Sequence, residues 1–286
     1  MLIIKNILKK INISPIFFFL AFTSVITGLF KDFLVFTSII IFHETGHILS
    51  AIYYKWKIKK INFYPYGGYI EFNEILNKPI KEEIIIVISG PISQILYFLT
   101  IYFLYNNNYI STNIYELFKH YHNSILLFNL IPIYPLDGIK IINLLLSKFI
   151  PYRYAHYISL LISIIFIIVF TFSSIIFGLS MNFILIVGVL LNQIIKEKKN
   201  HNMLCSKFIF ERYMYSLSFN KTKIINEENL KKMYRDYKHV FKTRNQYITE
   251  KKELKKIFRK VWLNHYNMVK SLMFVGPLTL QPHRKG

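Results

Sequence analysis

Two histidines and a glutamate stand together in an otherwise uncharged apolar run, Phe33 to Tyr54. His43 and His47 are four residues apart, so on a helix their imidazoles lie on one face, where both could bind one metal ion. Glu44 occupies the position of a general base in zinc-dependent hydrolysis. The run is long enough to cross a bilayer, where ionisable groups are costly unless something compensates them. We therefore interpret the three residues as a catalytic metal site within a membrane helix.

A catalytic zinc site usually has three protein ligands and an open position for water, so a third ligand is needed. Asp137 is the best candidate, because the only other aspartate before residue 200 is Asp32, which is expected at the outer end of the first membrane span. Asp137 follows a proline-broken segment and precedes Gly138, so its carboxylate can project from the start of a resumed helix. An ordinary turn or a helix cap is the alternative interpretation of this Asp-Gly pair.

Asn129 lies about two helical turns before this aspartate. Its amide could donate a hydrogen bond to a developing oxyanion or hold the substrate backbone. A hydrogen bond between two membrane helices is the alternative. We include Asn129 among the expected catalytic residues.

These roles predict hydrolysis of a peptide bond with one Zn2+ per chain. Bound zinc lowers the pKa of its water towards ~7, and Glu44 would take the proton and later protonate the leaving amine. Because a helix in lipid hides its own carbonyl groups, a substrate must unwind before cleavage. Two short strands are expected around Pro65-Tyr66-Gly67-Gly68, and they could bind the extended substrate as an added strand.

The composition predicts a membrane protein, since 53% of the 286 residues are hydrophobic and they concentrate before Lys196. We expect an all-α polytopic membrane protein of about six transmembrane helices, with a short β-hairpin-like loop between spans two and three. The fourth span should lose its helix near Pro132–Leu136, and a polar connection should precede it at residues 106–120. The expected spans are residues 15–30, 33–54, 83–105, 124–146, 158–177 and 183–195.

Charge divides the chain into a six-span domain, residues 1–195, and a basic tail, residues 196–286, which carries 22 Lys or Arg against 7 Asp or Glu. Lys and Arg also cluster before the first span and in alternate connections, so both termini are expected in the cytoplasm. We expect a small, mostly helical tail, with amphipathic helices at 227–241 and 252–266. It could be a solvated face or could bind anionic lipid or an acidic protein; nucleic acid is not expected as a direct partner.

The remaining histidines and the single cysteine are not expected to bind metal. Cys205 excludes an intrachain disulfide and a thiolate cluster, because it has no second cysteine to join. Three histidines are expected at the surface or the membrane interface: His120, His122 and His156. Four others are scattered through the tail without metal spacing: His201, His239, His265 and His283.

Four motifs in order along the chain together resemble the site-2 protease family of zinc metalloproteases. They are His43-Glu44-x-x-His47, Pro65-Tyr66-Gly67-Gly68, Ser89-Gly90-Pro91 and Asn129-Leu-Ile-Pro-x-x-Pro-Leu-Asp137-Gly138. The likeness covers roughly residues 1–213 and, more narrowly, resembles the sporulation members that process pro-sigma-K. It implies a six-span, zinc-dependent intramembrane protease with Asp137 as the third ligand and an active site that opens to the cytoplasm.

The same resemblance implies a membrane-associated protein substrate such as a pro-sigma factor, inhibitory membrane proteins as partners, and a place in the mother-cell membrane around the forespore. It does not indicate an oligomeric state. Sporulation members carry a nucleotide-sensing CBS domain at the C-terminus. Residues after about 214 show no clear strand–helix repeat of that kind, so we expect a degenerate or absent CBS domain here.

Two other classes of protein could use the same polar residues. A transporter or ion pathway also places His, Glu and Asp inside a membrane. Such a protein would be unaffected by chelators and would not need the spacing of His43 and His47. A non-catalytic membrane scaffold could keep the fold, but the presence of the three expected ligands and Glu44 does not favour it.

Overall fold

The computed structural model describes residues 10–64, 67–177, 181–215, 217–226, 229–243 and 246–259. The chain forms two compact units. Unit 1 comprises Met1–Glu211 and Lys231–Asp236; unit 2 comprises Arg212–Leu230 and Tyr237–Gly286. The candidate site lies in unit 1.

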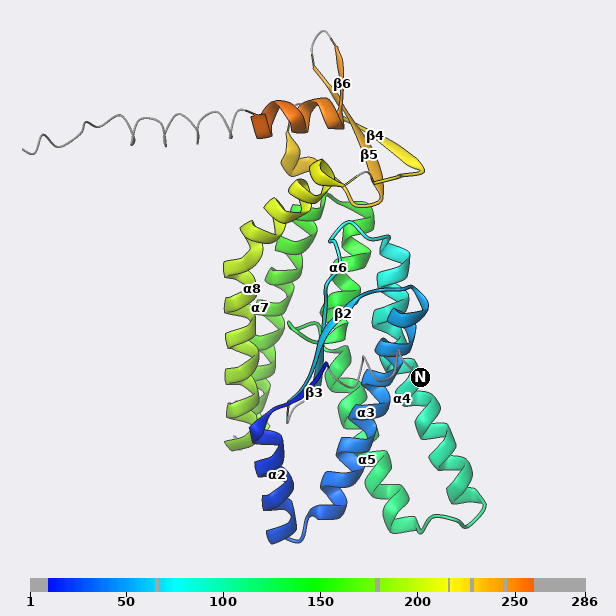
Figure 1. The fold of residues 1–286 in the computed structure, drawn as a ribbon. Helices are drawn as coiled ribbons and strands as arrows, with labels where there is room; N and C mark the ends of the chain where they lie inside the picture. The colour runs from blue at the N-terminus through cyan, green and yellow to red at the C-terminus, as the bar shows by residue number, and fades with distance from the viewer. Residues whose placement is uncertain are drawn as a thin grey trace, which may run out of the picture. The chain divides into compact units, whose positions relative to one another are not determined.

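Unit 1 is mostly helical (Figure 1). Within the described residues, three segments are long and apolar enough to cross a membrane: Phe30–Tyr53, Ile80–Asn106 and Tyr152–Ser173. These segments make the chain a membrane protein, while six spans remain a prediction. The helices are α2 (Pro15–Ile26), α3 (Phe30–Tyr53), α4 (Ile80–Asn106), α5 (Thr112–Leu130), α6 (Asp137–Phe149), α7 (Tyr152–Phe177) and α8 (Met181–Met214).

Helix α8 lies beside α7 in Figure 1, and apolar side chains of both helices share one core cluster with α6. α8 continues without a break through Lys196 to Met214. The expected domain boundary after Ile195 therefore falls inside a helix.

Helix α5 begins earlier than the sequence suggested. The polar connection expected at 106–120 is wrong, because α5 starts at Thr112. The helix is amphipathic: Tyr115, Phe118 and His122 recur at helical spacing and are buried, and Phe118 packs against Tyr97 and Phe98 of α4. The polar residues that suggested a loop lie on the opposite face.

The predicted break in the fourth span is confirmed. α5 ends at Leu130 and α6 starts at Asp137, with two prolines between them that cannot donate helical hydrogen bonds. The Tyr134–Pro135 peptide bond is cis. A Cβ atom at Gly138 would overlap the Leu130 carbonyl, so glycine lets the new helix start directly against the end of the old one.

Helices α3 and α4 pack closely through small residues. A Cβ atom at Gly46 would overlap both the Ser89 carbonyl oxygen and the Ser93 hydroxyl. The Ser89 hydroxyl donates to the Gly46 carbonyl at 2.9 Å and lies 2.7 Å from the Ser50 hydroxyl. Such contacts let two helix backbones approach closely in an apolar environment.

A three-stranded sheet lies beside α3. It contains β1 (Ile11–Ile13), β2 (Ile58–Tyr64) and β3 (Gly67–Phe72) in the order β1-β2-β3. β2 and β3 pair antiparallel, with Ile61 opposite Ile70, in the segment where two strands were expected. β1, which was not expected, pairs parallel to β2. The turn at 65–66 lies outside the described residues, as do Lys5 and Lys9 of the basic start.

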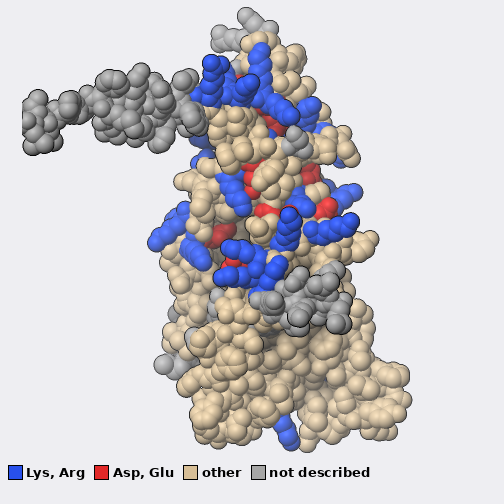
Figure 2. Space-filling view, viewed as in Figure 1, with Lys and Arg blue, Asp and Glu red and all other residues tan. Residues whose placement is uncertain are grey.

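Charge is distributed unevenly over the visible face of unit 1 (Figure 2). The surface over α2, α5 and the adjoining end of α3 is almost free of Lys, Arg, Asp and Glu. Charged side chains gather instead towards β2 and the start of α4, where the sequence places Lys57, Lys59, Lys60, Lys78 and Lys81. This pattern matches an apolar part in lipid and a polar end at a membrane surface.

Residues Lys231–Asp236 return to unit 1 and hold the start of α4. The Asp236 carboxylate accepts the Ile80 amide N–H at 3.1 Å, and the buried Arg235 guanidinium pairs with Glu83 at 2.7 Å. The first turn of a helix has unpaired N–H groups, so this carboxylate acts as a cap. The helix that lines the candidate site is thereby fixed at its polar end.

Unit 2 contains a three-stranded sheet, which was not expected in the tail. Its strands are β4 (Lys221–Asn226), β5 (Tyr237–Lys242) and β6 (Tyr247–Thr249) in the order β4-β5-β6. The helix expected at 227–241 is replaced by a short 3-10 turn at Leu230–Lys232 and by β5. The last expected helix is observed over residues 250–259, and residues 260–266 lie outside the described residues.

A buried ion pair holds unit 2 together. The Arg212 guanidinium contacts both carboxylate oxygens of Glu250, at 2.6 and 2.9 Å, and His239 donates its backbone N–H to the same carboxylate at 2.8 Å. Burial would raise the pKa of Glu250, but the hydrogen bonds from His239 and Arg212 outweigh it and lower the pKa from 4.5 to about 2. This stabilisation is complete above pH 4.5 and is lost as the pH falls towards 2.

We expect Glu250→Gln to destabilise unit 2 by on the order of 3 kcal/mol, because it removes the negative charge beside a buried guanidinium. Hydrogen exchange at neutral pH, followed by mass spectrometry, should show faster exchange in peptides covering β4, β5 and β6. Glu116→Gln, which changes an exposed glutamate of α5, is the matched control. Equal exchange in both variants would show that the pair contributes little.

Candidate metal centre

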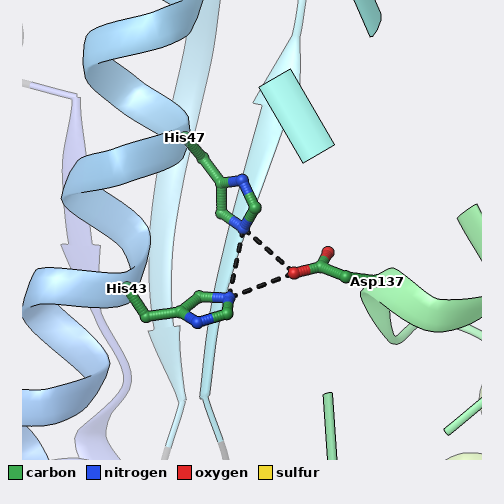
Figure 3. Close-up of side chains that lie close together, drawn as sticks. All are labelled: His43, His47 and Asp137. Carbon is green, nitrogen blue, oxygen red and sulfur yellow. Dashed lines mark hydrogen bonds and ion pairs between the residues drawn. The ribbon is translucent and has the colours of Figure 1, made fainter. Parts of the chain in front are cut away.

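Two helices bring the three expected ligands together (Figure 3). His43 and His47 project from one face of α3, and Asp137 projects towards them from the first residue of α6. All three are buried, with 3%, 7% and 4% of their surface exposed. They form the one group of three His, Cys, Asp or Glu ligands found close enough to hold a metal in the part of the chain that the structure describes.

The ligand atoms have the separations that a small ion requires. The Asp137 Oδ2 atom lies 3.0 Å from Nε2 of His43 and 3.1 Å from Nε2 of His47, and the two nitrogens are 3.2 Å apart. A tetrahedral ion with bonds of about 2.0–2.1 Å holds its ligand atoms about 3.3 Å from each other. The three atoms therefore fit around zinc with little adjustment.

The other nitrogen of each imidazole is already hydrogen-bonded. Nδ1 of His47 lies 2.7 Å from the Ile86 carbonyl oxygen, and Nδ1 of His43 lies 3.0 Å from Oε1 of Gln94. A carbonyl oxygen only accepts, so the protons of the neutral rings are on Nδ1 and both Nε2 atoms present lone pairs. Two lone pairs and a carboxylate oxygen that face one another in a buried site form a donor set that suits a metal ion.

The second oxygen of Asp137 is occupied by a different group. The Lys140 ammonium lies 2.9 Å from Oδ1, while Oδ2 faces the histidines. This division leaves one oxygen of the carboxylate for the metal. A zinc site with three ligand atoms keeps a fourth position open for water.

Glu44 lies next to the ligands and is also buried, with 7% of its surface exposed. A Cβ atom at Gly68 would overlap the carboxyl carbon of Glu44, so the edge strand β3 passes directly against this side chain. No side chain other than glycine fits there without displacing Glu44. The candidate general base is thus held between α3 and the sheet.

Gly90 likewise leaves space for side chains of another element, in this case the two histidines. A Cβ atom there would overlap Nε2 and Cε1 of His47 and would lie 2.8 Å from Nε2 of His43. Pro91 follows it and cannot donate a hydrogen bond to the carbonyl four residues earlier. At Gly90, α4 therefore faces the ligand atoms with its backbone and without a side chain.

The structure does not bring every expected residue to this centre. Asn129 is half-buried in the last turn of α5, and among the described residues its side chain makes no hydrogen bond to the ligand group. Its catalytic role remains a prediction.

Two histidines expected at the surface or interface are buried, so those predictions are wrong. His122 is 4% exposed and stacks on Phe98, and its carbonyl accepts a hydrogen bond from Gln94. His156 is 2% exposed and lies between Glu197 and His201 of α8. Their polar partners come from other helices, which neighbouring residues in the sequence do not reveal. His120 is exposed, as expected.

Sequence reasoning also missed two residues that contact the ligands, Gln94 and Lys140. Gln94 is a polar residue in the apolar α4, which is a signal for a buried hydrogen bond. Lys140 is three residues after Asp137, the helical spacing of an ion pair. With Asp137 chosen as the third ligand, either signal could have identified a residue that contacts the site.

Comparison with known proteins supports this site. Residues 32–120 match peptidase family M50, a range that includes His43, Glu44 and His47 and ends before Asp137. Over 161 residues the chain is 37% identical to "Stage IV sporulation protein FB" of Bacillus subtilis (strain 168), which covers 56% of each protein. The chain thus spans about half the length of this curated relative.

The fold is similar to a solved structure described as a site-2 protease from Methanocaldococcus jannaschii. The TM-score is 0.51, the identity is 24%, and the match covers 66% of this chain and 91% of that one. At this identity the similarity supports the fold alone. The assignment of Asp137 as a ligand rests on the distances within the structure.

We expect Gly90→Ala to weaken zinc binding at least tenfold, since a methyl group would occupy the space of the His47 imidazole and disturb the ligand arrangement. Competition with a chromophoric chelator, using detergent-purified protein, measures this affinity. Gly188→Ala is the matched control, because a Cβ atom at Gly188 of α8 meets nothing within 4 Å. Unchanged affinity in Gly90→Ala would contradict the close approach of α4 to the ligands.

Proposed function

We propose that this protein is a zinc-dependent intramembrane endopeptidase that cleaves a peptide bond in or near a membrane-embedded segment of a protein substrate. The observation that carries the proposal is the convergence of both Nε2 atoms and one Asp137 oxygen at 3.0–3.2 Å, among apolar helices, with Glu44 beside them. The match of residues 32–120 to peptidase family M50 and the apolar helices support the same class of enzyme.

The chain supplies the ligands and the proton transfers. Zinc, held by His43, His47 and Asp137, would act as a Lewis acid that polarises the peptide carbonyl and activates water. Glu44 takes a proton from the attacking water and returns it to the leaving amine. Asn129 is assigned to the developing oxyanion or to the substrate backbone.

The edge strand β3 is suited to hold the substrate. Among the described residues it has β2 on one side and no strand on the other, so its outer backbone groups can pair with an extended segment. Gly68 of this strand contacts Glu44. A segment added to β3 is therefore unwound and lies near the general base, which meets the requirement for a helical substrate.

The substrate and setting are proposed from the family resemblance and from the Bacillus subtilis relative, whose name refers to sporulation. We assign a membrane-associated pro-sigma factor as substrate and inhibitory membrane proteins as regulators. The distribution of Lys and Arg supports six spans with both termini in the cytoplasm. The proposed location is the mother-cell membrane around the forespore.

Glu44→Gln tests the function directly. Wild type purified in detergent should contain about one zinc per chain. In cells that express both proteins, wild type should cleave a pro-sigma factor. Glu44→Gln should retain zinc but lose activity by about 100- to 10,000-fold, because proton transfer is removed while the ligands stay. His43→Ala should lose zinc, and Asp137→Ala should bind it more weakly.

A well-folded wild type without zinc would overturn the proposal. Cleavage at the wild-type rate by Glu44→Gln would overturn the role of Glu44 as general base. Ion movement that chelators leave unaffected would instead support the transporter interpretation.

Gly68→Ala separates substrate chemistry from metal binding. The added methyl group should displace the Glu44 carboxylate, so we expect cleavage to fall at least tenfold while zinc content stays near one per chain. Pro-sigma factor cleavage and zinc content are measured on the same preparations, with Gly188→Ala as control. Loss of zinc in Gly68→Ala would show that β3 supports the ligands rather than the base.

A further inference from the structure

Gln94 is a fully buried amide in an apolar helix, with 0% of its surface exposed. It lies on α4 between α3 and α5. Its Oε1 atom is 3.0 Å from Nδ1 of His43, and its Nε2 atom is 2.9 Å from the carbonyl oxygen of His122. Placing an amide in an apolar interior is costly unless its groups are paired, and Gln94 is paired at both ends.

The His122 carbonyl fixes the direction of this chain of hydrogen bonds. A backbone carbonyl only accepts, so the Gln94 NH2 group must face it. The amide oxygen then faces His43 and can only accept, which places the imidazole proton on Nδ1. The remaining nitrogen of the neutral ring, Nε2, is the one that faces Asp137. The His122 carbonyl of α5 therefore determines the position of the His43 proton through two successive hydrogen bonds.

The second histidine ligand is held differently. Nδ1 of His47 donates directly to the Ile86 carbonyl at 2.7 Å, a backbone group that no side-chain substitution removes. Of the two histidine ligands, His43 alone depends on a side chain for its Nδ1 partner within the described residues. This asymmetry makes the contribution of Gln94 measurable.

We propose that Gln94 is a positioning residue of the metal centre, which holds His43 in the tautomer and ring orientation that directs Nε2 at the metal. The inference rests on the proposed metal-dependent function and adds a residue to it. Gln94 does not touch the substrate, because it is fully buried behind His43. Outer partners of histidine ligands typically affect metal affinity by about 10- to 100-fold.

A packing role makes a different prediction from a positioning role. Leucine and methionine have sizes close to that of glutamine and would fill the same space among apolar neighbours. Neither can accept the Nδ1 proton of His43. Glutamate is close to glutamine in size and keeps an accepting oxygen for Nδ1 of His43. Glutamate should therefore rescue a function that leucine and methionine lose.

The test measures zinc affinity by chelator competition on the detergent-purified full chain. We expect Gln94→Leu and Gln94→Met to bind zinc about 10- to 100-fold more weakly than wild type, and Gln94→Glu to bind it at least as tightly as wild type. Gln193→Leu, the same change at a half-buried glutamine of α8, should leave affinity unchanged. Thermal unfolding of the zinc-free proteins shows whether any loss of affinity merely follows a loss of stability.

A second readout does not depend on any variant folding. Nitrogen-15 NMR of histidine-labelled, zinc-free wild type should show His43 with its proton on Nδ1. His43 with its proton on Nε2 in wild type would overturn the inference, whatever the variants do.

The outcomes separate this inference from the proposed function. Zinc in wild type with unchanged affinity in Gln94→Leu and Gln94→Met would overturn the role of Gln94 alone. Equal weakening in Gln94→Glu would also overturn it, because the accepting oxygen is retained. A wild type without zinc would overturn the metal centre and this inference with it. Zinc binding without proteolysis would be consistent with the positioning role of Gln94 but would contradict the proposed endopeptidase activity.

Discussion

Three electron-pair acceptors face one another inside unit 1, and a small cation satisfies all of them at once. The Nε2 atoms of His43 and His47 and one oxygen of Asp137 lie 3.0–3.2 Å apart, while the Nδ1 protons are donated elsewhere. Without a cation, burying these three acceptors would cost desolvation free energy that contacts with apolar neighbours do not offset. The neighbouring elements are shaped to close this site: α4 passes with the bare backbone of Gly90 against the imidazoles, and Gly46 brings α3 close enough for that contact.

Much of the site could be predicted because its first part is local. Two histidines four residues apart reach the same ion from any helix, so His43 and His47 needed no tertiary information. Asp137 was predicted from chemical need and from the proline-broken segment before it. Gln94 could not be placed in the same way, because its role depends on the direction of an amide between α3 and α5. That direction is fixed by a backbone carbonyl, which every residue has and no sequence pattern marks.

The tail shows how a helical pattern can mislead. The apolar residues of 227–241 recur at three- and four-residue spacings and so predicted an amphipathic helix. In β5 the residues that point inward are His239 and Phe241, which alternate along a strand. A histidine counted as polar hides this alternation. The burial of His239 depends on Glu250 and Arg212, which lie 11 and 27 residues away in the sequence. Long-range ion pairs of this kind override local propensity.

Hydrolysis within a membrane needs water at a site that its helices shield from it. Lys140 indicates where water comes close. Its ammonium pairs with Asp137 at 2.9 Å, yet 40% of its side chain is exposed. An ammonium exposed to hydrocarbon costs several kcal/mol, whereas a lysine at a polar boundary extends its charged end into water. We therefore expect the start of α6 at that boundary, with solvent within one ion pair of the ligands. The charge balance agrees: two buried carboxylates, Asp137 and Glu44, offset a divalent ion, so the positive charge of Lys140 requires contact with solvent.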